Sequence, residues 1–285
     1  MKALRRWIEV VVEPRRILGL RHLPRFFRDW RRLRRAGMTA RLSDTWPQLA
    51  DRTASTPFDP HYFFQGAWPA RQLAQRRPTR HVDVGSDLRV VGVVSAFVPT
   101  TFLDLRPAAI AVPGLTPQAG DLNALPFADG SLESLSCMHV IEHIGLGRYG
   151  DPIDPDGSVK ACRELARVLR PGGWLFLSTP VGQPRVEFNA HRIFDPQVIE
   201  SMVAPLALTS FAWVDDRGRF HDQATPEDAR SARYACGMFA FQAPPATHSG
   251  LPGATTALGE PVLPLTAPTS TAPLTTRAQG EGAEA

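Results

Sequence analysis

The sequence is poor in cysteine and lacks a long apolar segment. Its three cysteines, Cys137, Cys162 and Cys236, are far apart and form no CxxC pair. This spacing argues against a disulfide framework or a zinc site and predicts buried, reduced thiols. The apolar run at residues 8–12 is interrupted by Glu9 and is far shorter than the roughly 18 residues of a membrane span. We therefore expect a cytoplasmic protein with neither a signal peptide nor a transmembrane helix.

Positive charge is concentrated at the N-terminus. The chain has 32 Lys/Arg and 28 Asp/Glu, yet residues 1–41 alone hold 13 of the former and 3 of the latter. The remaining residues therefore have a net negative charge of six. Within this basic arm, apolar side chains recur at helical spacing, first at Leu4, Trp7, Ile8 and Val11 and then at Leu23, Phe26, Phe27, Trp30 and Leu33. The spacing predicts two amphipathic helices.

The second of these predicted helices is rich in arginine. Its guanidinium groups belong to Arg25, Arg28, Arg31, Arg32, Arg34 and Arg35. An amphipathic helix of this composition suits the surface of an anionic membrane, where each cation contributes about 1 kcal/mol. A helix that packs on the main domain with a solvated basic face is an equal alternative. No recognised nucleic-acid-binding motif accompanies the charge, so we expect no nucleic-acid partner.

By composition, the chain divides into three parts. Residues 1–42 form the basic arm, residues 43–242 alternate between strand-like and helical patterns, and residues 243–285 are dominated by Pro, Ala, Thr and Gly without an apolar period. The last composition cannot bury enough apolar surface to offset the entropy of ordering. We therefore predict an α/β domain between a helical arm and a disordered tail.

The central part has the pattern of successive βαβ units. Strand-like runs lie at 81–84, 101–104, 132–138, 174–178, 206–214 and 234–241, and the clearest helix lies at 157–169, before Arg170-Pro171-Gly172-Gly173. This alternation predicts a mainly parallel sheet. The polar segment between the last two runs, with Asp215, Asp216 and Gly218, is too short for a usual helical crossover. It predicts an antiparallel closing pair of strands.

Polar residues follow successive predicted strands. Strand 81–84 holds Asp83 and leads into Gly85-Ser86, where a glycine lets the backbone approach a ligand at the carboxyl edge of the sheet. The next strand ends at Asp104, about 20 residues further on, where a carboxylate can accept hydrogen bonds from both hydroxyls of a ribose. Asp121, in the turn after Gly120, can accept a hydrogen bond from the amino group of adenine. Each acid alone suits ordinary turn chemistry, but together they predict a nucleoside site.

One more feature precedes a predicted strand, the segment Glu164-Leu165-Ala166-Arg167-Val168-Leu169-Arg170-Pro171-Gly172-Gly173. Together these features resemble the class I S-adenosylmethionine-dependent methyltransferases over residues 58–241. Within that superfamily the chain looks most like an uncharacterised family, a domain of unknown function first described from nematodes. The motifs are HYFFQGAW (61–68), HVDVGS (81–86), HVIEHIGLGRYGDPIDPDG (139–157) and FNAHRIF (188–194). The resemblance implies a Rossmann-like fold with a mainly parallel seven-stranded sheet whose last strand is antiparallel.

The resemblance also implies the cofactor, S-adenosyl-L-methionine, and the residues that hold it. By that resemblance Asp83 and Gly85, next to Ser86, shape its methionine and ribose end, Asp104 holds the ribose, and Asp121 with the Leu122 amide reads the adenine. The first loop departs from the superfamily, because Asp87 and Arg89 occupy positions that are often glycine. A non-catalytic methyltransferase-like binding or scaffold protein is therefore the alternative to methyl transfer.

His139, Glu142 and His143 fit the HxxEH pattern of zinc peptidases, which requires both histidines on one helical face. Their position directly after strand 132–138 instead predicts a turn that faces substrate, so a zinc hydrolase is a remote alternative. In this turn a neutral imidazole could accept a proton from a hydroxyl nucleophile. An ion ligand and a structural turn are equal alternatives for His143. His191, which follows the exit of the next strand, can reach the same crevice.

The segment 145–156 is a loop rich in Gly and Pro that contains Arg148, Tyr149, Asp151 and Asp154. Such a loop at the edge of the sheet suits a lid or an acceptor wall, and a solvated loop without ligand contact is the alternative. Its mix of Arg, Tyr and Asp makes a glycan or a lipid-linked saccharide the expected acceptor. We expect in-line methyl transfer that depends mainly on positioning and on exclusion of water.

Overall fold

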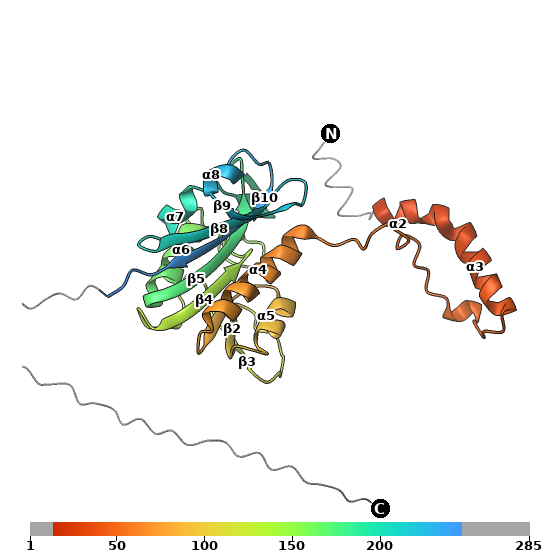
Figure 1. The fold of residues 1–285 in the computed structure, drawn as a ribbon, viewed down its shortest axis with the longest axis horizontal. Coiled ribbons are helices and arrows are strands. Elements are labelled where there is room, and N and C mark those ends of the chain that lie inside the picture. Colours follow the sequence, from red (N-terminus) through yellow and green to blue (C-terminus); the bar gives the residue numbers. More distant parts are fainter. Residues whose placement is uncertain (1–13, 247–285) are drawn as a thin grey trace, which may run out of the picture. The chain divides into compact units, whose positions relative to one another are not determined.

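The structure, a computed structural model, describes residues 14–246 (Figure 1). The first predicted amphipathic helix, around residues 4–11, and residues 247–285 of the predicted tail lie outside the described residues. In the arm, α2 (Pro14–Gly19) and η1 (Leu20–His22) lead into α3 (Leu23–Arg35), and η2 (Leu42–Asp44) follows. The second predicted amphipathic helix is therefore confirmed as α3. No side chain of α3 is buried.

The main domain is built on one eight-stranded sheet. Its strands are β1 (His81–Val84), β2 (Thr100–Asp104), β3 (Leu115–Ala119), β4 (Leu132–Met138), β5 (Leu169–Val181), β8 (Ala207–Val214), β9 (Phe220–Ala224) and β10 (Ala235–Gln242), in the order β3-β2-β1-β4-β5-β10-β8-β9. The first five strands in this order are parallel, whereas β10 is antiparallel to both β5 and β8. The predicted α/β class, mainly parallel with an antiparallel last strand, is thus confirmed.

The sheet has eight strands, where six apolar runs were recognised in the sequence and the resemblance implied seven. No apolar run marked β3. The additional strand, β9, pairs with β8 through the turn that contains Asp215, Asp216 and Gly218. It has the polar sequence FHDQA, so it lacks the alternating apolar pattern that marks a strand. The predicted antiparallel pair is nevertheless confirmed, because β10 runs directly beside β8. One predicted boundary is wrong: Leu169 does not end the helix but pairs with Leu132, which extends β5 at its start.

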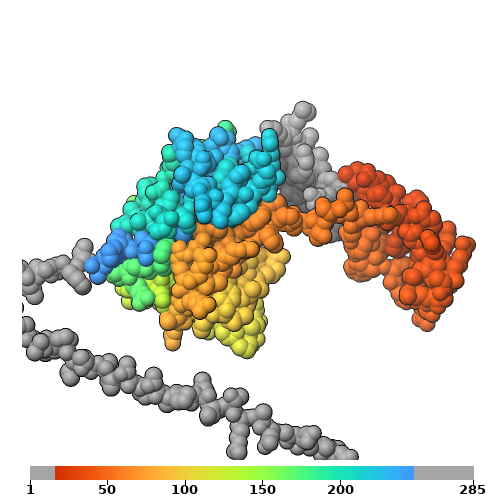
Figure 2. Space-filling model, viewed as in Figure 1, coloured from red at the N-terminus to blue at the C-terminus, as the bar shows by residue number. Residues whose placement is uncertain are grey.

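Helices cover both faces of this sheet. On one side lie α4 (Pro60–Arg76) and α5 (Leu88–Val94), and on the other α6 (Gly157–Arg167), α7 (Val198–Met202) and α8 (Pro226–Ala229). In the space-filling view α4, in orange, lies directly against the blue surface near β8 and β10 (Figure 2). None of the helices in residues 14–246 is long and apolar enough to cross a membrane.

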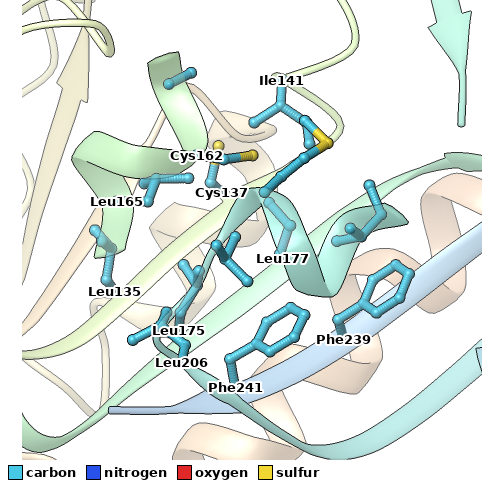
Figure 3. Close-up of a cluster of buried hydrophobic side chains, with 14 of the residues drawn as sticks. Leu135, Cys137, Ile141, Cys162, Leu165, Leu175, Leu177, Leu206, Phe239 and Phe241 are labelled. Atoms are coloured by element: carbon cyan, nitrogen blue, oxygen red, sulfur yellow. The ribbon is translucent and has the colours of Figure 1, made fainter. Parts of the chain in front are cut away.

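The larger hydrophobic cluster lies between the sheet and α6. Side chains of β4 and β5 meet Cys162 and Leu165 of α6, and Phe239 and Phe241 extend the cluster along β10 (Figure 3). Alternate residues of β10, such as Met238, face the second cluster under α4. All three cysteines are buried and free, which confirms the predicted thiols, and burial raises the pKa of Cys162 to about 12.

A small hairpin stands apart from the main sheet. It consists of β6 (Arg185–Glu187) and β7 (His191–Ile193), two strands of three residues each, which pair antiparallel. Such short strands leave little periodicity in a sequence, and neither was predicted. The hairpin follows the carboxyl end of β5, so it lies at the sheet edge where the predicted ligand site is expected.

Candidate functional site

A cavity of about 500 Å³ opens at the carboxyl ends of the parallel strands. This first cavity brings together six of the residues that were predicted from the sequence: Gly85, Asp104, Asp121, Leu122, His139 and His143. They come from the turns after β1, β2, β3 and β4. Its volume lies within the range of about 300–1,000 Å³ that is usual for small-molecule sites.

The turn after β1 forms one wall of the first cavity. Gly85 has φ of +69°, and a Cβ added there would lie 3.2 Å from a methyl group of Val140. Asp83 and Ser86 do not line the cavity but are buried beside the turn. The Ser86 amide donates to Asp83 Oδ1 over 3.1 Å, and the Met138 amide donates to Ser86 Oγ over 3.0 Å. These two residues therefore hold the turn in shape, while their predicted role in shaping the cofactor site stays a prediction.

Behind this turn lies a buried polar chain that the sequence did not reveal. His81 has Ser134 Oγ 2.8 Å from Nδ1 and Ser136 Oγ 2.8 Å from Nε2, and Ser136 also bonds to Asp83. Burial lowers the pKa of His81 to about 3 and raises that of Asp83 to about 6. An ionised Asp83 accepts the Ser136 proton, so Ser136 must accept from His81 Nε2–H. The three hydrogen bonds then all point the same way: Ser134 donates to His81, His81 donates to Ser136, and Ser136 donates to Asp83.

The two residues that replace glycine in the first loop do not obstruct the first cavity. Asp87 is the N-cap of α5, where its carboxylate accepts from the Arg89 amide over 2.9 Å. The Arg89 guanidinium folds back onto the same carboxylate and is 83% exposed. Neither side chain lines the cavity. The departure from the superfamily pattern therefore leaves the space at the turn open.

The two acids that were predicted to hold a nucleoside lie at the opposite wall. Asp104 Oδ1 accepts from the Arg106 amide over 2.7 Å, and Asp121 Oδ1 accepts from the Asn123 amide over 2.8 Å. Each contact is the ordinary turn chemistry that was the alternative for these residues. Within the described part of the chain no hydrogen bond to either Oδ2 is found, so both carboxylates keep acceptor capacity. The turn role and the ligand role are therefore compatible.

The loop after residue 145 closes the first cavity from outside. Asp151 accepts from the Gly145 amide over 2.7 Å and from the Tyr149 amide over 3.1 Å, which ties the loop to itself. The Tyr149 ring lies between the guanidinium groups of Arg106 and Arg148, each 5.1 Å from its centre. Tyr149 and Asp151 line the cavity. The loop thus contacts the predicted nucleoside space, in agreement with a lid.

The HxxEH residues lie in a turn, which does not fit a zinc peptidase. Residues 139–145 form bends and turns, and His139 has φ of +56°, outside helical geometry. No group of His, Cys, Asp or Glu side chains suited to a metal ion is found in residues 14–246. Arg192 of β7 binds this turn by two hydrogen bonds. Its backbone amide donates to the Glu142 carbonyl, and its guanidinium group donates to the Ile144 carbonyl over 2.6 Å.

Glu142 is buried between the two histidines of this turn. Its side chain is 1% exposed, with Oε1 lying 3.4 Å from His139 Nδ1 and 3.7 Å from His143 Nε2. Burial raises the pKa of Glu142 to about 8, and it lowers that of His139 to about 3 and that of His143 to about 4. At pH 7 the turn therefore holds two neutral imidazoles and a largely protonated carboxylic acid.

The tautomer of His143 follows from its contacts. Its Nδ1 lies 2.7 Å from the Ala190 carbonyl oxygen, which can only accept, and 3.2 Å from the Arg148 guanidinium, which can only donate. The shorter contact assigns the proton to Nδ1. Arg148 donates to the same carbonyl over 2.9 Å. Nε2 of His143 is consequently the unprotonated nitrogen. A neutral imidazole in this state can accept a proton from a nucleophile.

The last predicted residue, His191, lines a different cavity. This second cavity, of about 820 Å³, is also lined by His61 and Tyr234, to which the sequence assigned no role. The His191 ring centre lies 6.5 Å from that of His143, so the two cavities are neighbours beside the histidine turn, which is residues 139–145. His61 belongs to the motif HYFFQGAW at the start of α4, and its place in that motif was the signal that the sequence offered for it.

Comparison with known families supports the resemblance predicted from the sequence. A family model described as "Caenorhabditis protein of unknown function, DUF268" matches residues 128–234. The matched span includes the histidine turn, the loop after it and the β6–β7 hairpin. The predicted likeness to a family first described from nematodes is confirmed. No curated protein matches the chain in sequence.

Several solved structures have a similar fold. The YcgJ protein from Bacillus subtilis is 15% identical, with 65% of this chain and 100% of that chain covered and a TM-score of 0.46. The N-methyltransferase NodS from Bradyrhizobium japonicum WM9, in complex with S-adenosyl-L-homocysteine, is 11% identical over 65% and 89% of the two chains, with a TM-score of 0.45. The 1,6-didemethyltoxoflavin-N1-methyltransferase of Burkholderia thailandensis is 14% identical over 65% and 79% of the two chains, with a TM-score of 0.46. Because these identities and TM-scores are low, the assignment of the fold class rests on the strand order of this chain itself.

Proposed function

We propose that the protein binds S-adenosyl-L-methionine in the first cavity and transfers its methyl group to a hydroxyl-bearing acceptor. The observation that carries the proposal is the convergence of Gly85, Asp104 and Asp121 on one cavity at the carboxyl edge of a doubly wound sheet. The glycine leaves space beside the backbone, and each acid keeps one oxygen for a ligand. These residues fit a nucleoside.

In this proposal each element of the first cavity has a separate task. Asp104 holds the ribose, Asp121 with the Leu122 amide reads the adenine, and the Gly85 turn accommodates the methionine end. The cofactor supplies a methyl group on a positively charged sulfur, which leaves as a neutral thioether. Tyr149 and its loop exclude water from the cavity. Positioning of the reactants is the main contribution expected from the protein.

Transfer to a hydroxyl releases one proton, and His143 is the group placed to accept it. Its Nε2 is unprotonated because Nδ1–H is held by the Ala190 carbonyl. Burial depresses the pKa of His143 to about 4, so it is a weak base at pH 7. The proton transfer is then secondary to the methyl transfer. Variation of His143 should lower the rate with a hydroxyl acceptor more than it lowers cofactor binding.

Calorimetric titration of the full chain with S-adenosylmethionine and S-adenosylhomocysteine tests the proposal. We expect both to bind, because they share the nucleoside. Failure of both to bind would overturn it. The alternative of a non-catalytic binding protein predicts binding without turnover. Release of S-adenosylhomocysteine from labelled cofactor, with a glycan or a lipid-linked saccharide as acceptor, distinguishes these two functions.

The basic arm supports a second proposal, contact with an anionic membrane surface near a lipid-linked acceptor. Large apolar side chains in the described part of the arm remain exposed, among them Leu20 at 53% before α3, and Phe27 at 37% and Leu33 at 43% within it. Those of α3 alternate with its arginines, of which Arg28 is 69% exposed. Exposed apolar area beside guanidinium groups is the composition of an interfacial segment.

Co-sedimentation with lipid vesicles tests this contact on the full chain. We expect binding to vesicles that contain phosphatidylserine but not to neutral phosphatidylcholine vesicles, and binding should weaken with salt because exposed charges are screened over about 8 Å at physiological ionic strength. Arg31→Glu with Arg32→Glu should abolish it, whereas Arg77→Glu with Arg80→Glu in the main domain should not. Equal or salt-independent binding of all variants would contradict the proposal. A lower melting temperature of the arm variant alone would instead favour packing of α3 on the domain.

A further inference from the structure

The second cavity is assembled from four separate parts of the main domain. They are the start of α4, the β6–β7 hairpin, the turn between β8 and β9, and the start of β10. Its volume of about 820 Å³ exceeds that of the first cavity. The predicted nucleoside site uses none of its residues. The second cavity therefore has room for a separate molecule.

A band of aromatic and imidazole rings connects the two cavities. In the second cavity the His61 ring stacks on Tyr234, with centres 5.3 Å apart and planes inclined by 23°. The Tyr234 ring in turn lies 5.2 Å from that of His191. Ring centres of His61 and His139 are 6.5 Å apart, and His139 lines the first cavity. A molecule bound against His61 and Tyr234 therefore lies next to His139, which borders the first cavity.

The walls of the second cavity are held in place by their own contacts. Asp216 accepts from the backbone amides of Arg233 and Tyr234 over 2.8 and 2.7 Å, which fixes the start of β10. Arg185 donates to Glu187 over 3.1 Å and to the Arg233 carbonyl over 2.7 Å, which joins the hairpin to the same segment. These contacts preorganise the cavity, and preorganisation lowers the entropic cost of binding.

The charges around the second cavity nearly cancel. Four carboxylates, those of Asp59, Asp215, Asp216 and Glu187, face three guanidinium groups, those of Arg185, Arg217 and Arg233. A ligand with a net charge of either sign would meet like charges at this rim. Hydroxyl groups both donate and accept hydrogen bonds, so they find partners among carboxylates and guanidinium groups alike. The rings of His61, His191 and Tyr234 also give the cavity apolar surface for the C–H groups of a saturated ring.

We propose that the second cavity binds the methyl acceptor and that the acceptor is neutral and rich in hydroxyls, as a sugar ring is. This inference rests on the proposed function, because donor and acceptor then meet beside the histidine turn. His143 and His191 lie at the junction, with their ring centres 6.5 Å apart. Methyl transfer then requires the acceptor hydroxyl and the cofactor methyl group to meet beside these rings.

Saturation-transfer NMR on the full chain with S-adenosylhomocysteine tests the charge argument. The probes are methyl β-glucopyranoside, glucose 6-phosphate and glucosamine, which share one ring and differ in charge. We expect the strongest transfer to the neutral glycoside. Stronger transfer to either charged probe, or none to the glycoside, would overturn the inference. If S-adenosylhomocysteine itself does not bind, the proposed function fails, and this outcome is separate from failure of the acceptor cavity.

Two matched tyrosine variants test the location. Tyr234→Ala should weaken glycoside binding roughly tenfold and leave S-adenosylhomocysteine affinity unchanged, whereas Tyr149→Ala, which alters the first cavity, should do the reverse. Arg217→Ala, at an exposed position, serves if Tyr234→Ala does not fold, and Arg230→Ala outside both cavities is its control. Loss of both ligands in the Tyr234 or Arg217 variant, or of neither, would contradict the assignment.

Discussion

The two cavities lie at the same edge of the sheet but are formed in different ways. The first is made largely by the ends of β1, β2, β3 and β4 and the turns that follow them, so several of its residues have a local signal such as a glycine or an acid at a strand end. The second takes side chains from segments as distant in sequence as His61 and Tyr234. Ligand sites that arise from consecutive strand ends are visible in one sequence. Sites that arise from long-range convergence are visible only after folding.

The largest effect on ligand affinity is expected for the variant Gly85→Val, which alters the first cavity and not the second. A β-branched residue is strained at φ of +69°, and its Cβ would crowd Val140. Affinity for S-adenosylhomocysteine, measured by calorimetry, should fall by about 100-fold or more. Gly92→Val is the control, because nothing lies within 4 Å of a Cβ at that position. Equal affinities of the two variants would show that the Gly85 turn does not contact the ligand.

A smaller effect on ligand affinity should distinguish Asp104, which lines the first cavity, from Asp87, which does not. Asp104→Ala should weaken S-adenosylhomocysteine binding by on the order of 1.5–3 kcal/mol, since a charged acceptor is lost. Asp87→Ala should leave binding unchanged and lower the free energy of unfolding by about 1 kcal/mol, because Asp87 caps α5. Calorimetry and chemical denaturation measure these two quantities. Unchanged binding in Asp104→Ala would remove that residue from the site.

The histidine turn between the cavities should make stability depend on pH. Burial raises the pKa of Glu142 to about 8 from its usual 4.5, so between these values the folded state holds a proton that the unfolded state has lost. The free energy of unfolding should therefore fall as pH rises from 6.5 to 8. The buried histidines oppose this trend until about one unit above their usual pKa of 6.5, where the imidazoles are neutral in both states, so the fall is clearest toward pH 8. Denaturation of Glu142→Gln should show a flatter pH dependence, and Glu227→Gln, at an exposed position, should behave as the unaltered chain.

The smallest expected effect concerns the end of the domain, far from both cavities. Ala243 is buried and exchanges backbone hydrogen bonds with Gly172 and Gly173. Removing residues 247–285 should leave the melting temperature nearly unchanged, since their composition offers no packing face. Ending the chain at Gln242 should lower it, because the bonds of Ala243 are lost. A large decrease on removing only residues 247–285 would contradict the prediction of a dispensable tail.

Much of the fold was predictable because its signals are local. The strands that carry the core, such as β4 and β5, are apolar runs, and α6 has one apolar face that packs as its spacing predicted. Strand β3 was not predicted, since Pro117 and Gln118 interrupt its apolar pattern, as an edge strand permits. Strand β9 at the other edge is polar for the same reason.

The candidate site was predictable only in part. The motifs indicated which turns line the first cavity, but they did not separate contact from support, so Asp83 and Ser86 were grouped with residues that line it. That distinction depends on which way a side chain leaves the strand and what it meets there. The bonds of His81 to Ser134 and Ser136 cross from β1 to β4, and no spacing within one strand encodes them.

The position of β10 has a consequence for the order of synthesis. This strand lies between β5 and β8, yet it is the last strand of the domain to leave the ribosome. Domains generally begin to fold while they are being made, and unpaired strand edges favour aggregation. Until β10 emerges, β5 and β8 each expose an edge that no earlier strand of the chain can cover. Completion of this sheet is therefore a late, long-range event, and a chain stalled before Ala235 would present two open edges to its neighbours.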